Sequence, residues 1–173
     1  MFKSLYNSPL GILTLISDGE YLIEVNYENS DNKIFKENKL QIKDDLEIFL
    51  QTKKWLDIYF SGGNPSEMPQ IKLIGSDFQK EVWEQLLQIP YGYVTTYKEI
   101  ANEIANKRKI KKMSAQAVGT AVGKNPLSII VPCHRVVNVD FKVGNYTGGV
   151  DKKYYLLEKV EKFCIKNNCL KIK

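Results

Sequence analysis

The 173-residue sequence is poor in the side chains that most often bind metals or build a disulfide framework. It contains one histidine, His134, and three cysteines, Cys133, Cys164 and Cys169. A lone histidine without clustered cysteines gives zinc too few ligands, so we expect no metal site. An odd number of cysteines without framework spacing is typical of a protein from a reducing compartment.

Long apolar segments are also absent from the sequence. No stretch approaches the roughly 20 apolar residues that a membrane-spanning helix needs, and the N-terminus lacks the basic and then apolar order of a signal peptide. The hydrophobic fraction of 43% is enough for an ordinary core, which argues against disorder. We therefore expect a globular, cytoplasmic monomer that has no membrane partner.

Charge is unevenly distributed along the chain. Residues 1–75 carry 8 basic and 11 acidic groups, a net charge of −3, whereas residues 76–173 carry 17 basic and 9 acidic groups, a net charge of +8. A basic second half is the electrostatic footprint of a phosphate-binding surface. Charge alone leaves open the alternative of an ordinary solvated surface rich in lysine.

The first half of the sequence predicts a hairpin and a helix. Apolar and polar residues alternate along 11–16 and 21–27, and the Asp-Gly pair between these segments indicates a turn. Asp44 or Asp45 is the expected N-cap of a helix whose apolar residues recur at helical spacing as far as Phe60.

A segment rich in helix breakers separates the two halves. Residues 61–69 contain two glycines and two prolines in close succession with serine and asparagine, and they coincide with the change in charge sign. Such composition is typical of a domain boundary. We therefore expect one domain over residues 1–75, with a linker at about 61–75, and a second over residues 76–173.

Three helices with start signals are predicted in the second half. Ser76 or Asp77 opens the first, and a Pro-Tyr-Gly turn ends it. Thr96 followed by Glu99 forms a capping box for a short helix over about 97–105. A basic loop then leads to a helix capped by Ser114, so the last two helices resemble a helix-turn-helix arrangement.

The helix that follows Ser114 has an unusual composition, because residues 115–123 are nearly all alanine, glycine, valine and threonine. Each glycine weakens a helix by about 1 kcal/mol, so something must offset the two glycines. Either tight packing inside the protein or close approach of DNA would do so. Gln116 is the one side chain of this helix suited to reading base edges, so we expect shape-based or minor-groove contact rather than sequence-specific readout.

A Cys-His pair follows a proline inside an apolar segment, residues 127–137. Pro132 interrupts the strand that this segment would otherwise form and places Cys133 at a turn. His134 can remove the thiol proton, directly or through a water, and Arg135 adds positive charge that favours the thiolate. An isolated Cys-His pair would also fit a structural cysteine beside a capping histidine, so the surrounding motifs decide the interpretation.

The arrangement of residues 76–160 resembles the O6-alkylguanine-DNA alkyltransferase family. Near the N-terminus, Ser8-Pro-Leu-Gly11 before the predicted hairpin is similar to bacterial members, so the resemblance covers nearly the full chain. It implies an α/β (α+β) fold, with a catalytically inert ribonuclease-H-like domain followed by a winged helix-turn-helix-like domain. The matching segments are Ser76–Trp83, Ile89–Gly92, Tyr97 with Ile100 and Ala101, Ala117–Gly119, Asn125-Pro126, Pro132–Val136 and Gly144–Gly149.

The resemblance implies direct repair of DNA, in which an alkyl group passes from O6-alkylguanine in duplex DNA to Cys133. The damaged guanine is rotated out of the stack, because a thiolate cannot reach the O6 substituent in line within a paired duplex. The thioether product has no carbonyl for water to attack, so each molecule reacts once. No cofactor is expected, because the alkyl group is already on an activated oxygen. The resemblance does not settle whether O4-alkylthymine is also a substrate.

Residue roles also follow from the resemblance. Tyr97 helps to rotate the nucleotide and donates to the guanine ring, Asn125 ties the alanine- and glycine-rich helix to the active-site loop, and a backbone N–H near Thr147 supports O6 as negative charge develops. The implied catalytic residues are Cys133, His134, Glu161 and Tyr97. The implied DNA contacts are Thr96, Ser114, Ala115, Gln116, Ala117, Gly119, Lys124 and Arg135. The implied base pocket comprises Val122, Asn125, Val136, Asn145, Tyr146, Thr147 and Gly148.

Two positions depart from the family pattern. Gln116 stands where most members place an arginine that fills the gap left by the rotated base, and glutamine lacks the charge and stacks less well. Val160 stands where the family has the glutamate that orients the histidine, with Glu158 and Glu161 on either side. We select Glu161 for this role, although a regular helix would displace it by about 100°.

Three other functions compete with alkyl transfer. An alkyltransferase-like protein binds alkylated DNA without repairing it, but such proteins lack the acceptor cysteine that Cys133 would supply. A winged-helix regulator with an incidental Cys-His pair would bind DNA without reacting. A cysteine hydrolase would use the same thiolate but turn over repeatedly.

Overall fold

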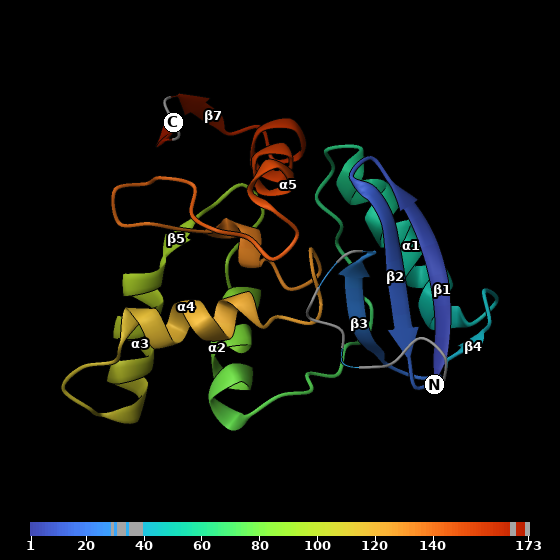
Figure 1. Ribbon diagram of the computed structural model, residues 1–173, viewed down its shortest axis with the longest axis horizontal. Coiled ribbons are helices and arrows are strands. Elements are labelled where there is room, and N and C mark those ends of the chain that lie inside the picture. Colours follow the sequence, from blue (N-terminus) through green and yellow to red (C-terminus); the bar gives the residue numbers. More distant parts are fainter. Residues whose placement is uncertain (29, 31–33, 35–39, 167–168, 172–173) are drawn as a thin grey trace. The chain divides into compact units, whose positions relative to one another are not determined.

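The computed structural model describes residues 1–28, 30, 34, 40–166 and 169–171 (Figure 1). The chain forms two compact units. The first consists of Met1–Ile74 and Pro126–Ile130, and the second consists of Gly75–Asn125 and Val131–Lys173. Within the described residues, no helix is both long enough and apolar enough to cross a membrane.

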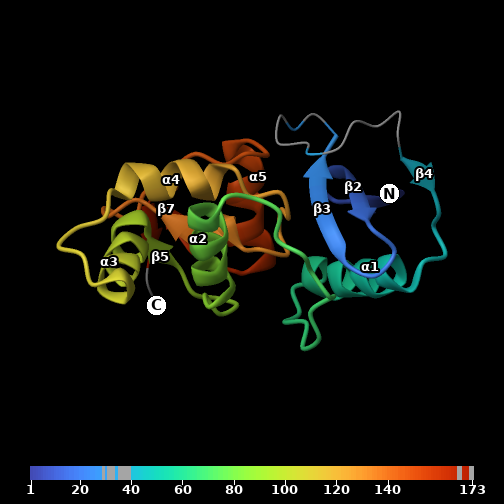
Figure 2. The same cartoon turned by 90° about the horizontal axis from the view of Figure 1, so that it is seen from below.

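A four-stranded sheet with one helix against it forms the first unit. The strands are β1 (Phe2–Ser8), β2 (Gly11–Ser17), β3 (Leu22–Tyr27) and β4 (Gln41–Ile42). They lie in the order β3-β2-β1-β4, and only β4 runs parallel to its neighbour. Helix α1 (Glu47–Phe60) lies along one face of the sheet (Figure 2) and buries Phe49, Leu56 and Tyr59. The predicted hairpin is confirmed as β2 and β3, with an irregularity between Ile16 and Ser17.

The predicted N-cap of α1 is wrong. The helix begins at Glu47, and its N-cap, Leu46, makes no side-chain hydrogen bond. Asp44 instead accepts a hydrogen bond from the Ser4 hydroxyl on β1 and lies 3.4 Å from Lys53 Nζ. The carboxylate therefore joins the helix to the sheet rather than capping the helix, a choice that local sequence does not reveal.

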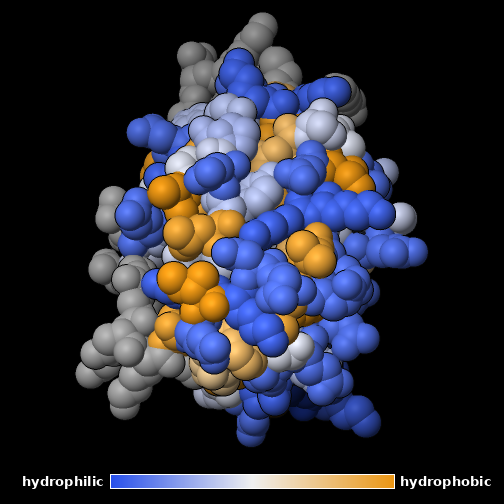
Figure 3. Space-filling model, turned by 90° about the vertical axis from the view of Figure 1, so that its right-hand side faces the viewer, coloured by the Kyte–Doolittle hydropathy of each residue, from blue (hydrophilic) through white to orange (hydrophobic). Residues whose placement is uncertain are grey.

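The face shown in Figure 3 is mainly hydrophilic, with apolar patches between the hydrophilic side chains. The exposed apolar side chains of the first unit include Leu5, Ile42 and Leu50. Separate apolar residues are ordinary on a protein surface, so they need no partner to explain them.

A short segment from the second half of the sequence completes the first unit. Val25 N–H donates to Pro126 C=O over 2.9 Å, and Ser128 N–H donates to Val25 C=O over 2.9 Å. The single bridge between Val25 and Leu127 is the full extent of this pairing in the described residues, so the predicted longer strand before Pro132 is wrong. Ile129 adopts φ 72°, a left-handed conformation that turns the chain out of the pairing direction.

Three packed helices form the main part of the second unit. Helix α2 (Asp77–Leu87) begins with a capping box between Ser76 and Gln79, and α3 (Tyr97–Arg108) begins with one between Thr96 and Glu99, as predicted for Thr96. Helix α4 (Ala115–Gly123) is capped by the Ser114 side chain, also as predicted. The contacts that α4 makes with α2 and α3 include a hydrogen bond of 2.8 Å from Trp83 Nε1 to Ala121 C=O.

The remaining elements of the second unit are short. The 3₁₀-helix η2 (Cys133–Arg135) leads into β6 (Val136–Val137), which pairs in parallel with β5 (Thr95–Thr96). Helix α5 (Val150–Tyr154) continues directly into a π-helix, η3 (Tyr155–Val160), and β7 (Cys164–Lys166) pairs with β8 (Cys169–Lys171). The predicted turn at Cys133 is therefore a turn of 3₁₀-helix, which follows Pro132 because proline offers no N–H for strand pairing.

Candidate active site

Cys133 lies buried at the first position of η2. Its side chain is held by Asn125, whose Nδ2 donates to Cys133 Sγ over 3.1 Å and to Val131 C=O over 2.9 Å. Burial raises the pKa of the Cys133 thiol, while the hydrogen bond from Asn125 and the positive charge of Lys153 act in the opposite direction. The structure thus places around the sulfur the groups that stabilise a thiolate.

The imidazole of His134 contacts a carboxylate at the end of the π-helix. His134 Nε2 lies 2.8 Å from Glu161 Oε1, and both side chains are fully buried. Burial lowers the pKa of His134, and the Glu161 carboxylate opposes this effect. An ionised carboxylate can only accept a hydrogen bond, so Nε2 of His134 carries the imidazole proton. Nδ1 is then the basic nitrogen of the ring.

The π-helix brings Glu161 to this position. Glu161 N–H donates to Leu156 C=O over 2.9 Å, five residues earlier, whereas an α-helix would pair it with Leu157. The wider turn of the π-helix rotates the side chain that follows Val160 toward the interior, where it meets His134. This resolves the displacement of about 100° that a regular helix implies.

Arg135 does not face the surface, so its predicted contact with DNA needs correction. Its Nε lies 3.0 Å and 3.2 Å from the two oxygens of Glu161, and its Nη1 donates to Ile89 C=O over 2.7 Å. The side chain is only 10% exposed. A buried guanidinium needs such hydrogen-bond partners. The positive charge of Arg135 is therefore paired inside the protein.

Thr96 also departs from the prediction of a DNA contact. It is buried, and its hydroxyl accepts from Glu99 N–H over 3.2 Å in the capping box of α3. Ser114 caps α4 in the same way through Ala117 N–H, at 3.2 Å, but remains exposed. Lys124, which ends α4, is exposed, and Ala117 is half-buried.

Tyr97, the first residue of α3, lies between α4 and the loop that carries the predicted base pocket. A Cβ atom at Gly119 would lie 3.7 Å from the Tyr97 ring, and one at Gly144 would lie 3.5 Å from its hydroxyl oxygen. Burial, together with the nearby Cys133, raises the pKa of Tyr97 to about 12. The hydroxyl therefore stays protonated at neutral pH and can donate a hydrogen bond.

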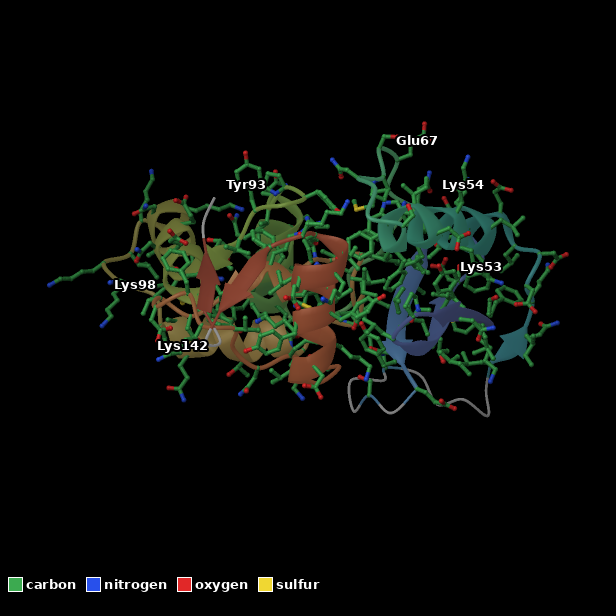
Figure 4. The ribbon with its side chains drawn as sticks, turned by 90° about the horizontal axis from the view of Figure 1, so that it is seen from above. Lys53, Lys54, Glu67, Tyr93, Lys98 and Lys142 are labelled. Atoms are coloured by element: carbon green, nitrogen blue, oxygen red, sulfur yellow. The ribbon has the colours of Figure 1, made fainter. Side chains whose placement is uncertain are left out.

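An open hollow of about 740 Å³ lies beside α4. Predicted site residues supply half of its lining, and the rest comes from positions that the sequence did not single out. Figure 4 shows Lys98, on α3, and Lys142 at the same end of the second unit. The lining residues are Tyr97, Lys98, Ala115, Gln116, Gly119, Thr120, Asn138, Val139, Asp140 and Asn145.

The other predicted pocket residues occupy varied positions around this region. Thr147 Oγ1 donates to Gly123 C=O over 3.0 Å, which joins the pocket loop to the end of α4. The ring of Tyr146 meets the His134 ring edge to face, with centroids 6.5 Å apart. Val122 and Val136 are buried, and Gly148 is half-buried.

Crowding inside the protein does not require the two glycines of α4. A Cβ at Gly119 would make only ordinary van der Waals contact with Tyr97, and a Cβ at Gly123 would meet no described atom within 4 Å. The sequence left two explanations open, and tight internal packing therefore does not explain the two glycines. The remaining explanation is close approach of a partner to the outer side of α4.

Lys153 is the functional candidate that the sequence analysis missed. It is fully buried, and its Nζ donates to Val136 C=O over 2.6 Å and lies 3.4 Å from Asn145 C=O. Burial lowers its pKa to about 8, while the nearby Cys133 opposes the shift. The sequence did contain a signal for this burial. Lys153 lies three residues before Leu156 and four before Leu157, so it shares a helix face with these two apolar residues.

Comparison with known proteins gives the same picture over both units. Residues 77–162 match the family described as 6-O-methylguanine DNA methyltransferase, DNA binding domain, and residues 1–73 match the ribonuclease-like domain of the same enzyme. The predicted order of a ribonuclease-like domain followed by a DNA-binding domain, in a mixed α/β protein, is confirmed.

Curated relatives and solved structures match over nearly the full chain. A methylated-DNA–protein-cysteine methyltransferase of Methanosarcina acetivorans is 38% identical over 169 residues, 95% of this chain and 100% of the relative. One from Haemophilus influenzae is 34% identical over 160 residues, 91% of this chain and 85% of the relative. The crystal structure of Mycobacterium tuberculosis OGT in complex with DNA superposes with a TM-score of 0.82 at 34% identity, covering 94% and 93% of the two chains.

This degree of likeness exceeds a shared fold. It covers both units, and it includes the segment that holds the buried Cys133, His134 and Glu161. The chain therefore belongs to the O6-methylguanine DNA methyltransferases, the DNA-repair enzymes that transfer a methyl group from methylated DNA to a protein cysteine.

Proposed function

We propose that Cys133 is the acceptor of this chain and that it takes the alkyl group from O6-alkylguanine in double-stranded DNA, once per protein molecule. The observation that carries the proposal is the contact of 2.8 Å between His134 and Glu161 next to the buried Cys133, which Asn125 holds. This arrangement supplies a nucleophile, a base and a group that orients the base. No cofactor takes part.

His134 removes the proton of Cys133 in this proposal. Glu161 accepts a hydrogen bond from Nε2–H and fixes the tautomer, so Nδ1 is the base, acting directly or through a water. Asn125 and Lys153 then stabilise the thiolate, because the amide donates to the sulfur and the ammonium places positive charge nearby. These groups oppose the rise in the thiol pKa that burial causes, although burial has the larger effect.

The transfer step is a displacement at the alkyl carbon. The sulfur forms a bond to that carbon as the bond from carbon to O6 breaks, and guanine leaves with the electron pair. A donor close to the base neutralises the charge that develops, and the Tyr97 hydroxyl suits this role because its pKa of about 12 keeps it protonated. A thioether remains on Cys133 and cannot be hydrolysed.

DNA approaches the outer side of α4 in this proposal. The hollow lined by Tyr97, Gln116 and Asn145 is open to solvent, and Gln116 is exposed at its edge. The glycines of α4 allow a duplex to lie close to the helix backbone, and the target guanine rotates toward Cys133 past Tyr97. Ser114, Ala115, Ala117, Gly119 and Lys124 are the further contacts that we propose along this helix.

One experiment separates this function from its rivals. The protein is incubated with a duplex oligonucleotide that contains O6-methylguanine, and the intact mass and the peptide map are measured. We expect one added methylene, located on Cys133, with no more than one transfer per molecule. Binding without a change in mass would support a regulatory protein, and repeated turnover would support a hydrolase.

Replacement of the acceptor is the matched control. Cys133→Ala removes the sulfur but leaves α4 and the hollow intact, so we expect no transfer and unchanged affinity for DNA in a binding titration. Transfer to another residue of this variant would show that the nucleophile is misassigned. We also propose that the protein acts as a cytoplasmic monomer, since a reactive free thiol requires a reducing compartment.

A further inference from the structure

The carboxylate of Glu161 has more partners than a base-orienting group alone requires. Besides His134, it accepts hydrogen bonds from Arg135 Nε on both oxygens and from Gly92 N–H on Oε2 at 3.2 Å. His134 and Arg135 lie on η2, whereas Gly92 belongs to the turn before β5. The position of the carboxylate is therefore determined from several sides.

The turn that precedes β5 restrains both the end of the π-helix and the Glu161 carboxylate. Tyr91 donates from its hydroxyl to Val160 C=O over 2.8 Å, which holds the last residue of the π-helix. Gly92 adopts φ 78°, a left-handed conformation that glycine accepts readily, and its N–H reaches Glu161. One turn thus fixes both the end of the π-helix and the carboxylate that follows it.

Arg135 joins that turn to the carboxylate. Its Nη1 donates to Ile89 C=O over 2.7 Å while its Nε serves Glu161, and the guanidinium lies over the Tyr91 ring, 5.7 Å from the centroid. A planar guanidinium can make these contacts at once, whereas a lysine ammonium cannot. The side chain adjacent to the catalytic histidine is thus bound to the group that orients that histidine.

We propose that Arg135 is a positioning residue for alkyl transfer, which fixes Glu161 against His134 and keeps His134 neutral before the reaction. This inference rests on the proposed acceptor role of Cys133. Glu161 follows a π-helix, an element of less regular geometry than an α-helix, so its side chain needs anchors outside its own helix. The family match alone gives Arg135 no such role.

The charges around His134 support the second part of the proposal. Glu161 favours the imidazolium, whereas Arg135 from η2 and Lys153 from α5 disfavour it, and burial lowers the pKa of His134 further. Cys133 and the ring of Tyr146 also lie beside the imidazole. Loss of Arg135 leaves the Glu161 charge less compensated, so the pKa of His134 rises and the acid limb of the rate profile moves to higher pH.

The test compares Arg135→Gln with Arg135→Lys by single-turnover transfer from O6-methylguanine duplex across pH. We expect Arg135→Gln to slow transfer by roughly tenfold or more, but by less than the full 10²–10⁴-fold contribution of a general base. We also expect the acid limb of the rate profile to move to higher pH. Arg135→Lys keeps the positive charge but lacks the planar guanidinium. We therefore expect the acid limb at its wild-type pH and a transfer rate between those of Arg135→Gln and the wild type. Affinity for DNA should stay unchanged in both variants.

A double substitution tests whether Arg135 acts through Glu161. Once Glu161→Gln is present, adding Arg135→Gln should cause little further loss of rate at a pH well above the acid limb, whereas the limb should still move upward, because the charge of Arg135 also acts directly on His134. An equal loss in both backgrounds, or weakened DNA binding with normal transfer, would overturn the proposal. If Arg135→Gln does not fold, Arg135→Lys decides, because wild-type rates in that variant would also overturn it.

The outcome for the wild-type protein keeps the two proposals distinct. Absence of a methylene on wild-type Cys133 would contradict the proposed acceptor itself. Normal transfer by the wild type, with the same rate and pH profile in Arg135→Gln, would contradict only the role of Arg135.

Discussion

Lys153 places an ammonium group in the protein interior, next to the thiol of Cys133. Its pKa of about 8, lowered from 10.5 by burial, corresponds to a cost of about 3 kcal/mol while the group is charged. The hydrogen bond to Val136 C=O returns about 1 kcal/mol of this. Such a cost is reasonable only if the charge serves the chemistry.

We therefore predict that Lys153→Met slows alkyl transfer but does not weaken the fold. Loss of the positive charge raises the thiol pKa further, which should lower the transfer rate on the order of tenfold per pKa unit. The free energy of unfolding should increase by about 2 kcal/mol, because methionine fills the site without a charge to bury. Single-turnover kinetics and urea denaturation at pH 7 measure the two effects.

The sign of the pH dependence gives the control for this variant. The unfolded chain binds the Lys153 proton more tightly, so this group makes the wild type more stable as pH rises from about 8 to 10.5. Tyr97, whose pKa is raised, acts in both proteins alike and cancels in the difference. The thiol pKa is higher in the variant, so Cys133 makes the variant lose more stability as pH rises and changes the difference in the same direction as Lys153. A stability difference that stays constant over this window would contradict the buried charge.

The same residues show what sequence could predict at this scale. Cys133 and His134 are adjacent in sequence, which suggests a thiol beside a base, and the resemblance to the family supplied their roles and the role of Tyr97. The resemblance to the family implied a DNA contact for Arg135, and only the distant Glu161 and Ile89 explain why its side chain is buried instead. The burial of Lys153 was also not predicted, because a charged side chain is usually exposed and the acceptor of its ammonium group, Val136, is distant in sequence.

Among the elements, the π-helix Tyr155–Val160 explains how Glu161 reaches the histidine, although a regular helix would turn its side chain elsewhere. Helix starts were predicted well where cap and partner lie three residues apart, as for Thr96 and Glu99. Asp44 was predicted wrongly, because its alternative partner, Ser4, is distant in sequence. A one-residue register shift within a helix leaves still less trace in sequence, since propensities hardly distinguish the two helical forms.

Deletion of Val160 tests the function of this π-helix. The shortened chain places the glutamate four residues after Leu156, the spacing of an α-helix, so we predict that it still faces His134 and that transfer stays within about tenfold of wild type. Single-turnover transfer measures this, and circular dichroism checks the fold. A folded variant that binds DNA but does not react would show that the π-helix is not a register adjustment.

The same deletion combined with Glu161→Gln is the control. It has the shortened helix without the carboxylate, so its transfer should fall to the level of Glu161→Gln alone. Retained activity in the combined variant would mean that another group orients His134.

At the scale of the whole molecule, the positive charge belongs to the second half of the chain, and the DNA-binding family match covers the same half. Lys98 lines the hollow beside α4, and its side chain is exposed. Lys54 is also exposed but lies on α1 of the first unit (Figure 4). The two lysines therefore form a matched pair with the same charge on different units.

We predict that Lys98→Gln weakens DNA binding and that Lys54→Gln leaves it unchanged. Each phosphate contact contributes about 0.9 to the slope of log affinity against log salt, or about 3.5-fold in affinity for a fourfold rise in salt. Loss of one contact should thus reduce the slope by about 0.9 for Lys98→Gln alone, in fluorescence titrations of a duplex over a range of salt. Equal slopes for the two variants would mean that DNA does not approach the hollow, since a contact elsewhere would not distinguish these lysines.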